Sequence, residues 1–204
     1  MAYFPVFADI EGKDCLIVGG GYVALRKAKD LVDFGACVVV IAEEILEDLT
    51  HLEGVTIHQE GFREDLLDER YYELVVAATD DPEVNRAVGL SCRKRRIPVN
   101  VVDDPGKGSF IFPAYLKAKD VVAAFSGGGS PVLARYMKEE SRSLVTERLG
   151  EIGELLAGCR PYVRSLGLGA EEKKALYERI LEAALKAREL PTEEEREEFV
   201  KRLL

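Results

Sequence analysis

Three consecutive glycines, Gly19 to Gly21, separate a short apolar segment from a segment with helical spacing. The apolar segment, residues 14–18, predicts a buried parallel strand, and residues 23–34 predict an amphipathic helix. With Ala24 the glycines form the pattern G-x-G-x-x-A. Between a strand and a helix this pattern is typical of a dinucleotide-binding site, because Gly19 permits a tight turn and Gly21 lets a pyrophosphate approach the backbone. The alternative is a glycine-rich turn without a ligand.

Strand and helix signals continue to alternate through the first hundred residues. Further strands are predicted at residues 37–41, 55–59, 74–78 and 97–102. A helix is predicted from Pro82 to about Arg93, with Asp80 or Asp81 as its cap. Repeated strand–helix–strand units imply a parallel sheet with helices on both faces. We therefore expect an α/β fold built on a Rossmann-type parallel sheet.

The pattern changes after Asp103. Residues 109–112 and 121–125 resemble an antiparallel pair of strands joined by a turn at 117–120. A loop with three glycines, Ser126–Ser130, then precedes a predicted helix that runs from 132 to about 148.

The remaining residues are almost wholly helical in signal. Breaks are predicted at 167–169 and at 191–192, and Thr192 with Glu195 forms a capping-box pattern for the last helix. We therefore expect three domains. They are a dinucleotide-binding Rossmann domain at 1–113, a small segment at 114–148 and a helical C-terminal domain at 149–204.

Charge and composition exclude several classes of protein. With 28 basic and 37 acidic residues, the formal net charge is −9, which argues against nucleic-acid binding because that needs a dense basic face. No apolar run approaches the ~20 residues that span a bilayer, and the N-terminus does not resemble a signal peptide. We expect a cytoplasmic protein. Four scattered cysteines and two histidines predict no resident metal site, and the thiols should be free and at least half-buried.

Two acids follow the second predicted strand. Glu43 and Glu44 lie about 20 residues after the glycine loop, where an acid can accept hydrogen bonds from an adenosine ribose and repel a 2′-phosphate. This favours NAD over NADP as cofactor. Alternatively, Glu43 and Glu44 begin the next helix as N-terminal acids.

Further polar residues follow the fourth and fifth predicted strands. Thr79 comes directly after the fourth, and Asn100 and Asp103 occupy the end of the fifth. Ligands bind at the carboxyl ends of parallel strands where the strand order reverses, so these residues should face the glycine loop. A carboxylate there, Asp103 or Asp104, can transfer a proton near the nicotinamide. The alternative is a solvated turn acid before Pro105.

Several motifs then occur in a recognisable order. They are Pro5 to Phe7, Cys15 to Gly21, Ala77 to Asp81 with Val84 and Asn85, Asn100 to Asp103, Ser109 to Ala114, and Ser126 to Arg135. Together they resemble the precorrin-2 dehydrogenase and sirohydrochlorin ferrochelatase family, the N-terminal module of siroheme synthase. The resemblance implies NAD-dependent oxidation of precorrin-2 to sirohydrochlorin. Some members also insert ferrous iron, and the family forms homodimers through a middle segment that matches residues 113–148.

The resemblance also implies site residues. The critical aspartate of the family falls on Asp103, which makes it the candidate catalytic residue. Candidate cofactor contacts are Gly19, Gly21, Tyr22, Val23, Glu43, Glu44 and Thr79. The substrate carries many carboxylates, so local cations and backbone donors should bind it. Candidate substrate contacts are Asn100, Lys107, Ser126, Gly127 and Arg135.

Three functional readings compete. The first is a precorrin-2 dehydrogenase, the second a bifunctional enzyme that also inserts Fe²⁺ into sirohydrochlorin, and the third a non-enzymatic NAD-sensing module. A sensor would not need the Asn100 to Asp103 and Ser126 to Arg135 motifs, which disfavours the third reading. The basic run from Arg93 to Arg96 could contact substrate, or could simply end a helix whose dipole favours cations there.

Overall fold

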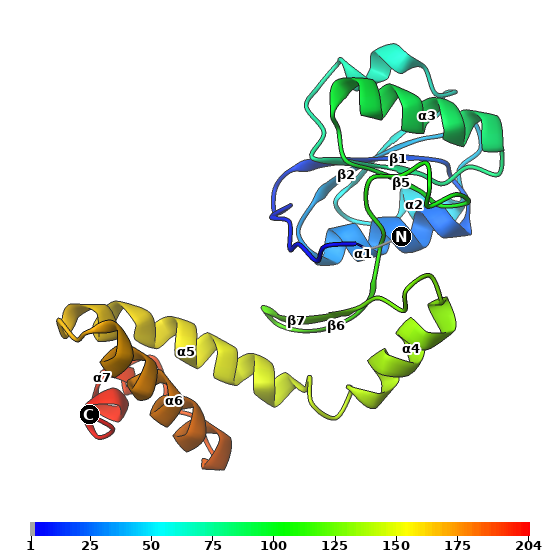
Figure 1. The fold of residues 1–204 in the computed structure, drawn as a ribbon. Helices are drawn as coiled ribbons and strands as arrows, with labels where there is room; N and C mark the ends of the chain where they lie inside the picture. The colour runs from blue at the N-terminus through cyan, green and yellow to red at the C-terminus, as the bar shows by residue number, and fades with distance from the viewer. Residues whose placement is uncertain (1–2) are drawn as a thin grey trace. The chain divides into compact units, whose positions relative to one another are not determined.

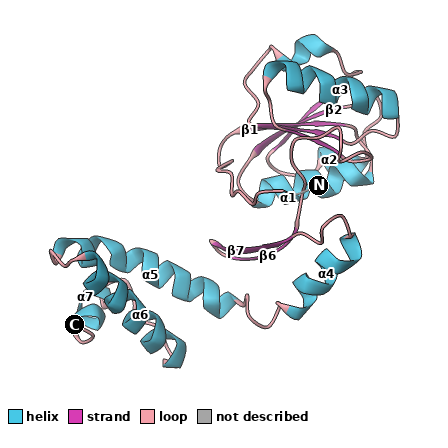
Figure 2. Ribbon diagram, in the orientation of Figure 1, coloured by secondary structure: helices cyan, strands magenta, loops and turns pink. Residues whose placement is uncertain are grey.

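The computed structural model describes residues 3–204 (Figure 1). The chain divides into two compact units, one ending at Phe112 and the other spanning residues 113–204. The first unit alternates strands and helices, and the second combines a strand pair with helices (Figure 2).

Five parallel strands form the sheet of the first unit. Its elements are β1 (Asp14–Val18), α1 (Tyr22–Asp33), β2 (Cys37–Ile41), α2 (Glu47–Thr50), β3 (Val55–His58), the 3₁₀ helix η1 (Glu64–Leu67), β4 (Leu74–Ala77), α3 (Pro82–Arg95) and β5 (Val99–Val101). The strand order is β3-β2-β1-β4-β5, so the order reverses between β1 and β4. This confirms the predicted α/β class and the Rossmann-type parallel sheet.

Each face of this sheet is covered by helices, as Figure 1 shows. One hydrophobic core joins alternate strand residues such as Ile17, Val40 and Val76 to α1 and α2. The other joins residues such as Leu16 and Val75 to α3 and η1. Because successive strand residues point to opposite faces, apolar residues run without interruption along the central strands. These uninterrupted apolar runs are the reason why the strands could be predicted from the sequence.

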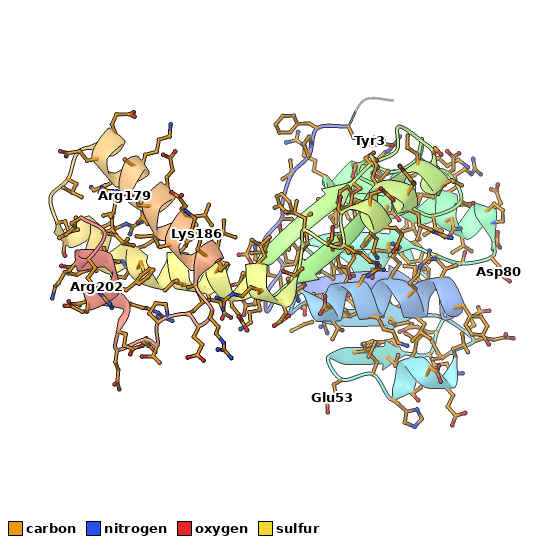
Figure 3. All side chains as sticks on the ribbon, turned by 90° about the horizontal axis from the view of Figure 1, so that it is seen from below. Tyr3, Glu53, Asp80, Arg179, Lys186 and Arg202 are labelled. Carbon is orange, nitrogen blue, oxygen red and sulfur yellow. The ribbon has the colours of Figure 1, made fainter. Side chains whose placement is uncertain are left out.

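The second unit begins with two antiparallel strands and continues as helices. Its elements are β6 (Ala114–Ala118), β7 (Val121–Phe125), α4 (Pro131–Glu140), α5 (Glu147–Ser165), α6 (Ala170–Lys186) and α7 (Arg196–Lys201). A hydrophobic core that includes Ile152, Leu176 and Val200 joins α5, α6 and α7. Arg179, labelled in Figure 3, donates from Nη1 on α6 to the carbonyl of Leu204 at 3.0 Å and so ties the C-terminus to this bundle.

Two predicted elements of the second half were wrong. The antiparallel partner of β7 is β6 at Ala114–Ala118 and not residues 109–112. The amides of Ser109 and Phe110 both donate to the carbonyl of Val99, so the 109–112 segment is bound to β5 without forming a strand. The turn between β6 and β7 is correspondingly shorter than predicted and consists of Lys119 and Asp120.

The helix predicted from 132 to 148 is two helices. α4 ends at Glu140, and α5 starts after Thr146, whose Oγ1 accepts a hydrogen bond from the amide of Leu149 at 3.3 Å. A threonine side chain that satisfies a free amide in this way starts a new helix. At the last predicted cap, the Glu195 carboxylate does accept from the amide of Thr192 at 2.9 Å, but α7 starts only at Arg196.

Candidate functional site

The glycine loop follows β1 at the point where the strand order reverses. Gly19 has φ +126°, and a Cβ added there would lie 2.3 Å from the carbonyl oxygen of Ala78 at the end of β4. A Cβ on Gly20 would lie 2.0 Å from the carbonyl oxygen of Glu44. A Cβ on Gly21 would meet no atom within 4 Å. The first two glycines are therefore required by the protein's own packing, whereas Gly21 leaves space that a ligand can fill.

The N-terminus of α1 faces this space with its amides free of side-chain caps. Gly21 is the N-cap residue, no side chain accepts a hydrogen bond from the first amides, and the first turn contains no acid. Free amides and the positive end of the helix dipole attract an anion such as a pyrophosphate. Tyr22 is 78% exposed and Val23 is 37% exposed, so two apolar side chains border the loop. This arrangement fits a dinucleotide, as the G-x-G-x-x-A pattern predicted.

Glu43 and Glu44 follow β2 with exposed side chains. Helix α2 begins only at Glu47, so the alternative that Glu43 and Glu44 start this helix was wrong. Their backbone borders the glycine loop, since the carbonyl of Glu44 occupies the position next to Gly20. The side chain of Gln59 donates to the carbonyl of Glu43 at 3.1 Å. Contact between either carboxylate and a ribose stays a prediction.

The carboxyl ends of β1, β4 and β5 are aligned. Val18 pairs with Ala77, and Ala77 pairs with Val101, so Thr79 and Asp103 each lie two residues beyond the same row. The ladder also continues past these pairs, because the amide of Ala78 donates to Val18 at 2.8 Å. This alignment brings the ends of β4 and β5 to the edge of the sheet at which the glycine loop lies.

One side chain connects Thr79 to Asp103. Asn85, on the first turns of α3, donates from Nδ2 to the carbonyl of Thr79 at 2.9 Å and to Oδ1 of Asp103 at 3.2 Å. The helix is held in place by Asp81, whose Oδ1 accepts from the amide of Glu83 at 2.8 Å. The structure thus shows that Asp81, and not Asp80, is the cap.

Sequence reasoning did not assign Asn85 to the site, although it noted the residue in a motif. Asn85, Val88 and Cys92 follow helical spacing on the buried face of α3. Val88 and Cys92 are apolar, so a polar residue at a position where helical periodicity predicts an apolar one is the signal that could have identified Asn85.

Asp103 and Asp104 have different surroundings. Asp103 is exposed, and no cation lies within ion-pair distance of it in the part of the chain that the structure describes. Asp104 accepts from the amide of Gly106 at 3.0 Å and pairs with the Nζ of Lys107 at 3.3 Å. Arg93 holds the same loop, because its Nη2 donates to the carbonyl of Gly106 at 2.9 Å. Asp104 therefore stabilises the turn in which it lies, whereas the Asp103 carboxylate is exposed and has no cation as partner among the described residues.

Asn100 is buried within the first unit. It is 7% exposed, and its Nδ2 donates to the carbonyl of Phe110 at 3.1 Å. On the same side of the sheet, the Nζ of Lys27 lies 3.7 Å from the ring centroid of Phe112 and 3.5 Å from Oδ2 of Asp30. Burial lowers the pKa of the Lys27 ammonium, and Asp30 opposes this shift. One donor of Asn100 is thus used by the protein, and its predicted substrate contact remains untested.

Ser126, Gly127 and Arg135 belong to the second unit. Ser126 and Arg135 are exposed, and a Cβ on Gly127 would lie 2.2 Å from the carbonyl oxygen of Ser130. Ser130 caps α4, since its Oγ accepts from the amide of Leu133 at 3.3 Å. The loop therefore has a fixed turn and exposed glycines, and its role in substrate binding stays a prediction.

The basic run at the end of α3 is engaged within the protein. The Nε and Nη2 of Arg95 donate to the two carboxylate oxygens of Asp68 at 2.7 and 2.6 Å. This bond holds the pKa of the Asp68 carboxyl below its ordinary value. Lys94 lies 3.7 Å from a carboxylate oxygen of Glu64. These contacts support the reading of the run as a structural helix end.

The cysteines are free, as predicted, but they differ in exposure. Burial raises the pKa of the Cys15 and Cys92 thiols to about 12, and it also raises the pKa of Cys159. Cys37 is exposed, which contradicts the expectation that all four thiols are at least half-buried. Cys37 is exposed because it is the first residue of β2, at the end of the strand, whereas Val38 and Val39, which follow it on opposite faces of the sheet, are both buried.

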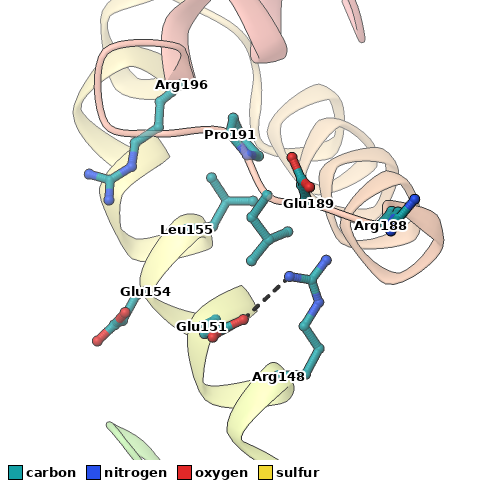
Figure 4. Close-up of a pocket in the computed structure, with 9 residues that line it drawn as sticks. Arg148, Glu151, Glu154, Leu155, Arg188, Glu189, Pro191 and Arg196 are labelled. Carbon is teal, nitrogen blue, oxygen red and sulfur yellow. Dashed lines mark hydrogen bonds and ion pairs between the residues drawn. The ribbon is translucent and has the colours of Figure 1, made fainter.

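A cavity of about 470 Å³ lies in the second unit between α5 and the segment that joins α6 to α7 (Figure 4). Arg148 pairs with Glu151 there at 3.3 Å, and Leu155 and Pro191 supply apolar lining. None of the predicted site residues lines it.

No group of three or more His, Cys, Asp or Glu side chains within residues 3–204 could hold a metal ion. Across the same residues, none of the helices combines the length and the apolar character that crossing a bilayer requires.

Comparison with known proteins identifies the family. A family model described as "Putative NAD(P)-binding" matches residues 6–114, more than half of the chain. The chain belongs to this NAD(P)-binding family. Membership confirms the dinucleotide-binding fold and the cofactor class that the glycine loop predicted.

Curated relatives of this NAD(P)-binding chain are siroheme synthases, as its motifs indicated. The siroheme synthase of Nitrosomonas europaea is 40% identical over 187 residues, which cover 89% of this chain and 39% of that protein. Siroheme synthase 2 of Yersinia enterocolitica is 36% identical over 199 residues, or 96% of this chain and 42% of that protein. The chain thus spans about two fifths of the length of these relatives.

A solved structure shares the whole fold of this family member. It is SirC, described as a precorrin-2 dehydrogenase, with a TM-score of 0.73 at 24% sequence identity, and the match covers 98% of each chain. The similarity extends through the helical C-terminal part as well as the dinucleotide-binding unit.

Proposed function

We propose that the chain is an NAD-dependent precorrin-2 dehydrogenase, which oxidises precorrin-2 to sirohydrochlorin in siroheme or another tetrapyrrole pathway. The observation that carries this proposal is the alignment of the open Gly21 position with Thr79 and Asp103 at one edge of the sheet. The names of the relatives support the same chemistry, since they include siroheme synthases and a precorrin-2 dehydrogenase.

The oxidation removes a hydride and a proton from the macrocycle. Bound NAD supplies the hydride acceptor. The part of the chain is to hold the dinucleotide at Gly21, Tyr22 and Val23 and to accept a proton at a carboxylate oxygen of Asp103. Thr79 and the glycines then contact the cofactor, and Glu43 or Glu44 binds its ribose. These two carboxylates favour NAD, because they would repel the 2′-phosphate of NADP.

The carboxylates of the substrate need local positive charge in an acidic protein. Lys107 meets this need near Asp103, since its ammonium has three donors and the bond to Asp104 uses one. In the second unit, Arg135 is exposed on α4 and Ser126 and Gly127 open the glycine loop that precedes it. We include Asn100 among the substrate contacts through the polar atoms that Phe110 does not engage.

A homodimer is part of the proposal. Val132, Leu133 and Tyr136 on α4, and Leu144 after it, are exposed apolar residues within the 114–148 segment. A two-stranded sheet such as β6–β7 is marginally stable by itself, so a partner copy that covers this segment would stabilise it. Replacing Leu133 with lysine should therefore produce monomers in light scattering, whereas Leu185→Lys on α6 should leave the mass unchanged.

The bifunctional reading is the second candidate. Insertion of Fe²⁺ requires the pyrrole nitrogens to lose protons, and an exposed carboxylate such as Asp103 can accept them. The siroheme synthase relatives favour this reading, and we place either activity in the cytoplasm, where free thiols such as Cys37 persist.

Two absorbance assays separate these cases. Purified chain is first given precorrin-2 with NAD⁺, and NADH and sirohydrochlorin should form together. It is then given sirohydrochlorin with Fe²⁺ or Co²⁺ and no NAD⁺. No sirohydrochlorin above the uncatalysed rate would refute the dehydrogenase. Metal insertion above the uncatalysed rate would establish the bifunctional reading, and NAD⁺ binding without either reaction would indicate the sensing module.

A further inference from the structure

Asn85 is a buried polar residue on an otherwise apolar helix face. It is 1% exposed, and its neighbours on that face of α3, Val88 and Cys92, are fully buried in the core beneath the helix. A buried amide is costly unless its donors and acceptor are all bonded. The bonds that Asn85 makes therefore show what its position requires.

The Asn85 amide has a protein partner at each of its polar atoms. Its Oδ1 accepts from the amide of Thr79 at 3.0 Å and lies 2.8 Å from the Thr79 hydroxyl, whose single hydrogen it shares with the carbonyl of Asp81 at 3.0 Å. Its Nδ2 donates one hydrogen to the carbonyl of Thr79 and the other to Oδ1 of Asp103. Three of the four bonds hold the backbone and side chain that follow β4, and the fourth reaches the end of β5.

We propose that Asn85 is a positioning residue that orients the Asp103 carboxylate relative to Thr79. The inference rests on the proposed function for its consequence in catalysis, but its geometric part concerns only the apoprotein. A carboxylate with one oxygen held by a fixed donor presents its other oxygen in a defined direction, from which it can accept a proton.

The charged groups near Asp103 have other partners, so Asn85 provides its one fixed contact among the described residues. From α3, Asp81 caps the helix, Arg86 pairs with Glu83, and Arg93 binds the carbonyls of Gly106 and Gly108. From the following loop, Lys107 pairs with Asp104. Without the amide of Asn85, an exposed side chain at the end of a strand would sample several rotamers.

Asn85 also links the residues that follow β4 to the residues that follow β5. Because one planar amide binds Thr79 and Asp103, a displacement of β4 relative to β5 would break bonds at both. We therefore infer that Asn85 fixes the distance between Thr79, a predicted cofactor contact, and Asp103, the predicted proton acceptor.

The first test uses the wild-type chain and no substrate. The side-chain amide resonances of Asn85 in ¹⁵N NMR should shift with pH at the same midpoint as the Asp103 carboxyl. Asp103→Asn should abolish that shift, and Asp104→Asn should leave it unchanged. An Asn85 amide that does not respond to the Asp103 titration would overturn the proposal, whatever the chain catalyses.

The second test uses variants and activity. Asn85→Leu keeps the approximate shape without polar atoms or charge, and Asn85→Ala removes the side chain. Both should lower kcat by about 10- to 100-fold while leaving the KM for precorrin-2 within about twofold of wild type. Both should also weaken NAD⁺ binding, because three of the lost bonds hold Thr79. Ser91→Ala is the matched control, because Ser91 is buried on the same helix with an unbonded hydroxyl.

The outcomes of the two tests are distinct. Folded Asn85 variants with the kcat of wild type would contradict the positioning role. If the variants do not fold, the NMR test decides alone. If wild type does not oxidise precorrin-2, the proposed function fails, but a shared Asn85 and Asp103 titration would still establish the contact.

Discussion

The ammonium of Lys107 lies 3.3 Å from Oδ2 of Asp104, in a turn whose backbone Asp104 also holds through the amide of Gly106. Two adjacent aspartates therefore have separate partners, since Asp103 is bound by Asn85. Spacing alone left the two acids as alternatives, and the resemblance to the family favoured Asp103. Their contacts differ in the same sense, because Asp104 is engaged by its own turn. That Asp103 acts on a ligand stays a prediction.

Asp103→Ala should lower turnover of precorrin-2 by about 10²- to 10⁴-fold, the range for loss of a general base. Because Asp103 is exposed and lies beyond the strand, the affinity for NAD⁺ should be close to wild type. The melting temperature should fall by a few degrees, since a buried donor of Asn85 loses its acceptor. Asp104→Ala should also lose a little stability but should retain most of its turnover. Equal turnover in the two variants would remove Asp103 from the mechanism. Steady-state kinetics measures the turnover of each variant, and calorimetry measures its melting temperature.

Gly21→Ala should fold but bind NAD⁺ at least about tenfold more weakly, because its new methyl group occupies the space where a pyrophosphate approaches the backbone. Gly20→Ala should fail earlier, since its Cβ would lie 2.0 Å from the carbonyl oxygen of Glu44. Thermal unfolding and titration with NAD⁺ separate these effects. Unchanged NAD⁺ affinity in Gly21→Ala would mean that the dinucleotide does not use this loop.

Replacing the acids after β2 should change the choice of cofactor. Glu43→Lys or Glu44→Lys should weaken NAD⁺ binding and strengthen NADP⁺ binding, because a cation there attracts a 2′-phosphate. Glu47→Lys, on the exposed first turn of α2, is the matched control. The ratio of the two dissociation constants is the measurement, and a ratio that no variant alters would exclude both acids from the ribose.

Stability should fall at alkaline pH. The Cys15 and Cys92 thiols have pKa values of about 12 in the folded chain, compared with 9.0 when unperturbed. Between these values the unfolded chain loses protons that the folded chain keeps, so rising pH favours unfolding. Urea denaturation at pH 8 and pH 10 should show the decrease, and it should be smaller in a Cys15→Ala, Cys92→Ala double variant. An equal decrease in that variant would assign the effect to other groups.

The same burial predicts thiol reactivity. At pH 8 an aromatic disulfide reagent should modify Cys37 in the folded chain and all four cysteines only after unfolding, because a buried thiol is neither ionised nor accessible. Cys37→Ser should remove the rapid phase. A rapid phase that persists in this variant would show that a buried cysteine opens readily.

Much of the first unit could be predicted because a parallel sheet has a simple sequence pattern. β2 reads as an uninterrupted run of β-branched residues from Val38 to Ile41, since the sheet is covered on both faces. The end of α1 was also visible, because Gly35 adopts φ +78° and its amide binds the carbonyl of Val32. Local chemistry and periodicity agreed at these positions.

The missed features depend on contacts between distant residues. The apolar residues from Phe110 to Phe112 suit a strand. Instead, the amide of Phe110 binds the carbonyl of Val99 and its carbonyl accepts from the side chain of Asn100, so the segment joins β5 without strand pairing. Helical periodicity extends across Ser141 to Thr146, and only the bond from Leu149 to Thr146 shows where α5 starts. The bridge from Asn85 to Asp103 spans 18 positions, which spacing cannot reveal.

The strand order of the first unit reverses between β1 and β4, so the chain from β1 to β3 builds one half of the sheet and the chain from β4 onward builds the other. The acids proposed to favour NAD over NADP, Glu43 and Glu44, precede β4, and the proposed proton acceptor Asp103 follows it. Recombination between related genes at the β3–β4 connection should therefore exchange nucleotide preference while the acid–base apparatus is inherited intact. Compatibility in such chimeras would depend on the β1–β4 pairing and on the two cores that both stretches share, with the approach of Gly19 to the carbonyl of Ala78 as one close contact in this interface.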